Sequence, residues 1–85
     1  MGAIEFLASV AGTIRERGDE YGEAHPLFND IARRWSVTLG FEVSPEQVAI
    51  CLIDLKLARL SHNPNHADSI RDIAGYAAIL SEISS

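Results

Sequence analysis

The sequence predicts an all-α protein, a small four-helix bundle that is completed by dimerisation. Four segments carry apolar residues at helical spacing, and glycines and prolines separate them. No segment shows the strict alternation that is typical of a half-buried strand. The chain has 85 residues, of which 47% are apolar. A chain this short buries a modest part of its surface, so we expect one domain over residues 1–85 that hides apolar surface between subunits.

The first half of the chain predicts two helices joined by a polar loop. Apolar residues recur at helical spacing over Ala3–Arg17. Residues 18–26 contain Gly18, Gly22 and Pro26, which predict a loop or a broken turn. A second helix is expected over Leu27–Leu39, and Gly40 suits its C-terminal cap.

The third helix has the clearest start signal in the sequence. Ser44 is a good N-cap, Pro45 suits the first helical position, and Gln47 completes a capping box. This helix is expected to continue to about Leu60, before a loop that contains Asn63-Pro64. A fourth helix then runs from His66 or Ala67 to Ile83, and its Gly75 suggests close approach of a neighbouring helix.

Composition limits the functions that the chain can have. Twelve acidic and seven basic residues give a net charge of −5, which argues against duplex nucleic acid as a partner. The apolar surroundings of the single cysteine, Cys51, predict a buried, inert thiol and a reducing cytoplasmic location. Glu5 interrupts the first apolar stretch, so we expect no signal peptide, and no apolar run is long enough to cross a membrane.

Charges inside apolar helices are the best functional indication in this sequence. Val48–Leu60 is apolar on all sides, which predicts a buried helix, yet it carries Asp54, Lys56 and Arg59. On a helical wheel Asp54 lies roughly opposite Lys56, so the two cannot pair within one helix. Lys56 and Arg59 either extend to solvent or contact phosphate.

A group of carboxylates is the candidate catalytic and metal site. Asp68 and Asp72 lie one helical turn apart, and Tyr76 continues the same face. If Asp54 faces them, three acids converge and require a cation such as Mg²⁺ between them. In the alternative, Asp68 and Asp72 face solvent, and Asp54 pairs with an arginine of another helix, namely Arg33, Arg34 or Arg71.

The charged segment after the first helix supplies further candidates. Arg15, Arg17 and Tyr21 have the chemistry to contact phosphate and base, and Glu16 or Glu20 offers another metal ligand. A solvated loop is the simpler interpretation of the same residues. Trp35 is expected in the core rather than as a platform for stacking a base.

The motifs in order resemble a family of small phage and prophage proteins of unknown function. They are Tyr21-Gly22, Phe28 to Trp35, Asp54-Leu-Lys-Leu-Ala-Arg59, and His66-Ala-Asp68 followed by Asp72-Ile-Ala-Gly-Tyr76. Such proteins look similar to the MazG and dUTPase-like all-α nucleoside triphosphate pyrophosphohydrolases. That resemblance implies an oligomeric helical bundle in which acids on two facing helices bind Mg²⁺. It also implies cleavage of an NTP or dNTP between the α and β phosphates.

Two functions therefore follow from the sequence. In the first, Asp54 and Asp72 are catalytic, and Asp54, Asp68 and Asp72 bind Mg²⁺. The substrate is then bound by Arg15, Arg17, Tyr21, Lys56, Arg59 and Tyr76. The resembling enzymes carry a Glu-x-x-Glu on one helix and a Glu-x-x-Asp on another, whereas here the third helix offers Asp54 alone and the fourth offers Asp68 and Asp72 four residues apart. The acids missing from these two helices suit the second function, a non-catalytic phage counter-defence protein that sequesters a nucleotide or inhibits a host defence complex.

Overall fold

Four α-helices make up the structure, a computed structural model that describes residues 2–21 and 23–85. They are α1 (Ala3–Tyr21), α2 (Ala24–Leu39), α3 (Pro45–His62) and α4 (Ala67–Ile83). No strand occurs in the described residues, so the predicted all-α class is confirmed. None of the described helices is long and apolar enough to cross a membrane.

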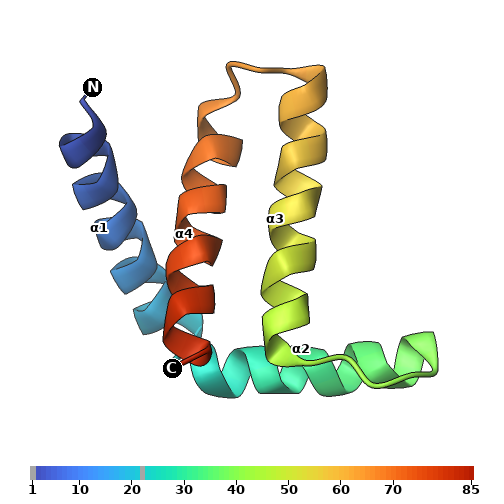
Figure 1. The fold of residues 1–85 in the computed structure, drawn as a ribbon. Coiled ribbons are helices and arrows are strands. Elements are labelled where there is room, and N and C mark those ends of the chain that lie inside the picture. The colour runs from blue at the N-terminus through green and yellow to red at the C-terminus, as the bar shows by residue number, and fades with distance from the viewer. Residues whose placement is uncertain (1, 22) are drawn as a thin grey trace.

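The helices are arranged as an antiparallel pair with one helix on its side and one across its end. Figure 1 shows α3 and α4 side by side, α1 on the far side of α4, and α2 crossing beneath them. Short connections between helices favour antiparallel neighbours, and α3 and α4 are such a pair. The same arrangement does not hold for α2 and α3, because the chain turns between them.

That turn is fixed by hydrogen bonds to one side chain. Gly40 ends α2 in the left-handed conformation, with φ of 81°, which glycine adopts without steric cost. The Val43 amide then donates to Ser36 Oγ over 2.8 Å, and the hydroxyl donates to the Ala32 carbonyl over 2.7 Å. These bonds hold residues 40–43 against α2 and start α3 across it.

The start of α3 confirms the capping prediction. Ser44 Oγ accepts from the Gln47 amide over 3.1 Å, and Gln47 Oε1 accepts from the Ser44 amide over 2.9 Å. The fourth helix also begins with a side-chain cap, because His66 Nδ1 accepts from the Ser69 amide over 3.2 Å. Both caps satisfy amides that the first turn leaves without helical partners.

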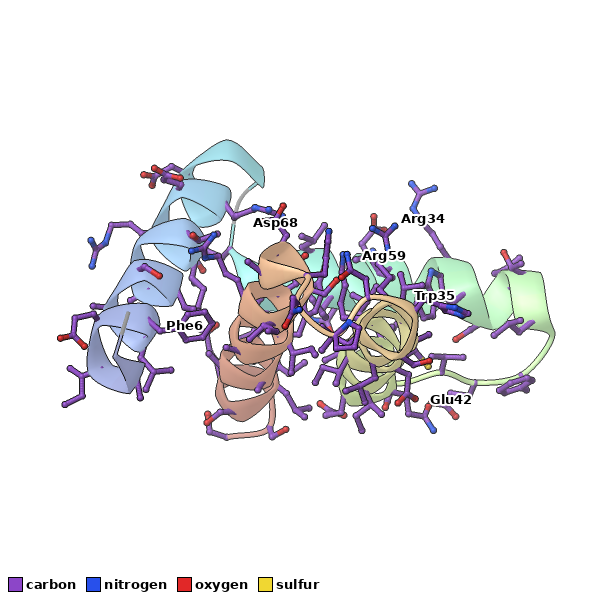
Figure 2. All side chains as sticks on the ribbon, turned by 90° about the horizontal axis from the view of Figure 1, so that it is seen from above. Phe6, Arg34, Trp35, Glu42, Arg59 and Asp68 are labelled. Carbon is purple, nitrogen blue, oxygen red and sulfur yellow. The ribbon has the colours of Figure 1, made fainter. Side chains whose placement is uncertain are left out.

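The core lies where α2 crosses the lower ends of α3 and α4. Its buried apolar residues are Phe28, Ala32, Val43, Val48, Ala49 and Ile83. Trp35 packs against this core, as predicted, and Figure 2 shows it on α2 beside α3. Val10 of α1 is also buried.

Two sequence predictions about the first loop and about α3 are wrong. Residues 18–21 continue α1 rather than forming a loop, because one glycine costs a helix only about 1 kcal/mol. Residues 24–26 begin α2, because proline is tolerated in the first turn of a helix. The apolar α3 is buried on one side only, and Ile50, Leu55 and Leu57 are each about half exposed. Cys51 is likewise exposed rather than buried, because α3 is buried on one side only.

Candidate functional site: an arginine-lined pocket beside α4

A pocket of about 470 Å³ lies between α1, α2 and α4, within the usual range for small-molecule sites. Its walls are mainly apolar and include Val10 and Ile14 of α1, Phe28 of α2 and Ile79 of α4. The pocket therefore forms because α1 packs on α4 while the start of α2 passes below both helices.

Two arginines from different helices line this mainly apolar pocket, together with three acidic residues, Glu23, Asp72 and Glu82. Arg17 reaches it from α1, and Arg71 reaches it from α4. The Arg71 side chain is only about one-third exposed, and its single ion pair, with Asp68, is long at 3.8 Å. Arg71 Nε is buried and has no hydrogen-bond partner among the described residues. A buried donor without a partner costs free energy, so Arg71 is ready to donate to an anionic ligand.

Asp72 and Tyr76 line the same pocket one helical turn apart on α4. Three of the residues chosen from the sequence, Arg17, Asp72 and Tyr76, are thus brought together. Gly75 lies between the last two, and a Cβ atom there would meet nothing within 4 Å. The expectation that Gly75 allows a close helix contact is therefore wrong. Its missing side chain leaves space in the pocket instead.

Asp72 is held by an ion pair with Lys56 of α3. Lys56 Nζ lies 3.0 Å from Asp72 Oδ2, and only 16% and 22% of the two side chains are exposed. The pair answers the question that the sequence raised about Lys56, which turns toward α4 rather than to solvent. It also places Asp54, on the opposite side of α3, away from α4.

The three acids proposed as metal ligands are consequently not found together. Asp54 is exposed on α3, and 80% of the Asp68 side chain is exposed beside Arg71. Asp72 contacts Lys56. No group of three or more His, Cys, Asp or Glu residues in the described chain is placed to hold a metal ion. Within one chain, the described residues therefore do not form the Mg²⁺ site that the resemblance implies.

The remaining substrate-binding candidates lie outside the pocket or outside the described residues. Arg15 and Arg59 are exposed and do not line it. The side chains of Tyr21 and Glu20 are not among those the structure describes. Arg33 and Arg34, considered as partners of Asp54, both pair with Asp30 over 3.1 and 3.2 Å. Hydrogen bonds from these two guanidinium groups lower the pKa of the Asp30 carboxyl below its ordinary value.

Sequence reasoning missed Arg71 as a pocket residue. It considered Arg71 only as a partner for Asp54, because the sequence does not show that the sides of α4 face different helices. A signal was present in the sequence. Arg71 is one residue before Asp72 and four before Gly75. The guanidinium group of Arg71 is therefore expected to lie beside the space that Gly75 leaves on α4.

The fold and pocket define a small all-α protein with a mainly apolar pocket that two arginines and three acidic residues also line. The chain belongs to the family described as Domain of unknown function (DUF6378), whose model matches residues 5–84. It is 41% identical over 69 residues to the Gene 55 protein of Mycobacterium phage L5, and 40% identical over 68 residues to the Gene 55 protein of Mycobacterium phage D29. The resemblance to a phage protein family of unknown function is thereby confirmed.

These relatives are longer than the chain. Each alignment covers 80% of the chain but only 44% of the L5 protein and 45% of the D29 protein, so the chain spans less than half of the relatives it matches. No solved structure matches the chain. The link to MazG-like pyrophosphohydrolases receives no support from these comparisons.

Proposed function

We propose that this member of a phage protein family binds a nucleoside triphosphate, or a similar phosphorylated small molecule, in the pocket between α1, α2 and α4. The observation that carries the proposal is Arg71 Nε, which is buried and has no hydrogen-bond partner among the described residues, in a pocket also lined by Arg17. A phosphate group supplies the oxygen acceptors that these guanidinium groups need. The apolar walls and Tyr76 offer a surface for the flat base.

Hydrolysis between the α and β phosphates is the second candidate. It is favoured by Asp72, a carboxylate that lines the pocket and would lie close to a bound triphosphate. We place binding first because the described residues of one chain assemble no group of acids for Mg²⁺. Binding without turnover is also what a nucleotide-sequestering counter-defence protein requires.

One experiment tests binding and separates the two candidates. The protein is incubated with each dNTP, with and without Mg²⁺, while thermal stability and pyrophosphate release are recorded. A ligand present at 100 times its Kd stabilises the folded state by about 2.7 kcal/mol. Stabilisation without pyrophosphate release supports the binding protein, and release that is lost in Asp72→Ala supports the hydrolase.

Variants locate the binding in the pocket. Arg71→Ala removes the unpartnered donor, and Gly75→Phe fills the space beside Tyr76, so both are expected to abolish the stabilisation. Arg34→Ala is the matched control, because it removes an exposed arginine that lies outside the pocket. Failure of every nucleotide to stabilise the wild-type protein, or equal stabilisation of wild type and Gly75→Phe, overturns the proposal.

A further inference from the structure

The side of α3 turned away from α4 is an apolar surface without a neighbour in the described chain. Figure 1 shows α4 on one side of α3, α2 beneath it, and no helix on the other side. We call this surface the outer face of α3. Its residues are all exposed, and they are Gln47, Ile50, Cys51, Asp54, Leu55, Leu57 and Ala58.

The whole chain exposes more surface than a compact monomer of its size, and the excess is large enough for one standard interface. The accessible surface is 5918 Å², whereas a compact folded monomer of 9.3 kDa exposes about 5,000 Å². The excess is on the order of 900 Å², and a standard protein interface buries about 800 Å² on each partner. The radius of gyration agrees, because it is 13.6 Å where about 12 Å is usual for this length.

The chemistry of the outer face suits a second copy of itself. Apolar side chains dominate it, and Asp54 is its single charged residue. A two-fold contact pairs the same surface on both subunits, so an apolar face is its own complement. The middle of α3 lies between Ile53 and Asp54. Two antiparallel copies that cross there place Ile50 of one copy near Leu57 of the other.

We propose that the outer face of α3 is the interface of an antiparallel homodimer in which the two Asp54 side chains lie near the two-fold axis. Two like charges at that position oppose association. The dimer then forms through the apolar residues and in spite of Asp54, which limits its affinity. Because the pocket lies on the other side of the molecule, beside α4, dimerisation leaves it open.

Sedimentation equilibrium of the wild-type chain and three variants tests this proposal. Leu57→Glu adds a charge to the outer face and is expected to yield monomers, whereas Val37→Glu, on an exposed part of α2, leaves the dimer intact. Asp54→Asn removes the opposing charges and is expected to tighten the dimer about tenfold. A monomeric wild-type chain, equal dissociation by Val37→Glu, or a weaker dimer in Asp54→Asn overturns the proposal.

Cross-linking tests the position of the axis independently of affinity. In a Cys51→Ser background, Asp54→Cys places one thiol per chain near the proposed axis. Oxidation is expected to give a covalent dimer for this variant and not for Val37→Cys in the same background. The reverse pattern, or no covalent dimer with Asp54→Cys, overturns the antiparallel arrangement. Neither result depends on whether a nucleotide binds.

Discussion

The ion pair between Lys56 and Asp72 joins α3 to α4 and provides the sharpest test of the packing. Its atoms are 3.0 Å apart, and about four-fifths of each side chain is buried. Exposed ion pairs contribute about 0.2–1 kcal/mol to stability, whereas hydrogen bonds to charged groups contribute about 1.5–3 kcal/mol. Burial places this pair in the upper range, so losing one partner is expected to cost about 2 kcal/mol.

Three variants measure that contribution by a double-mutant cycle. Lys56→Met and Asp72→Leu each leave one partly buried charge without its partner, so each is expected to lower the free energy of unfolding by about 2 kcal/mol. For a chain of this size, a loss of 2 kcal/mol corresponds to a fall in Tm of about 8–16 °C. The double variant replaces the pair by apolar contacts and is expected to be more stable than either single variant.

The assay is urea unfolding followed by circular dichroism, with Arg33→Ala as a control for an exposed pair. Arg33 bonds Asp30 on the surface of α2, and its removal is expected to leave the unfolding midpoint almost unchanged. The reasoning is refuted if the costs of the two single variants simply add in the double variant. Additive costs mean that the two side chains do not interact.

Three further predictions concern local structure. Gly75→Ala is expected to stabilise the protein by about 0.5–1 kcal/mol in urea unfolding, because it favours the helix and its Cβ atom meets nothing; a destabilised variant would show that the space is filled. Ser44→Ala removes the capping box and is expected to cost about 1 kcal/mol in the same assay, with Ser61→Ala, an exposed serine in the last turn of α3, as the control. The lowered pKa of Asp30 means that its stabilising contribution is present at neutral pH and is lost as the pH falls through that pKa. Wild type and Asp30→Asn are therefore expected to differ in Tm at neutral pH and to converge in acid, and a constant difference would contradict the assignment.

The starts of α3 and α4 could be predicted from the sequence because the interactions that set them are local, whereas α2 begins at Ala24 rather than at the predicted Leu27. Ser44, Pro45 and Gln47 are near neighbours, and their types alone specify the start of α3. Glycine is a weaker signal. Gly18 suggests a helix end, yet α1 continues through it to Tyr21.

The orientation of α3 could not be predicted, and the candidate site depended on it. The helical wheel correctly separates Asp54 from Lys56, but α3 has apolar residues on all sides, so the pattern does not show which charge faces α4. The metal-site hypothesis requires Asp54 to face α4. In the structure Lys56 faces α4 instead and pairs with Asp72. A contact between residues this far apart in sequence follows from packing, and packing was the missing information.

The most direct test of the proposed function is a titration of the ¹⁵N-labelled protein with a dNTP, followed by the amide signals in NMR spectra. If the nucleotide binds in the pocket, the largest shifts are expected at the amides of residues that line it. Examples are Thr13 and Gly18 of α1 and Gly75 and Ile79 of α4. Amides near the end of α2, such as those of Thr38 and Leu39, are expected to remain unchanged. Shifts confined to the end of α2 around Thr38 and Leu39, or no shifts at saturating nucleotide, would contradict the assignment of this pocket as a nucleotide site.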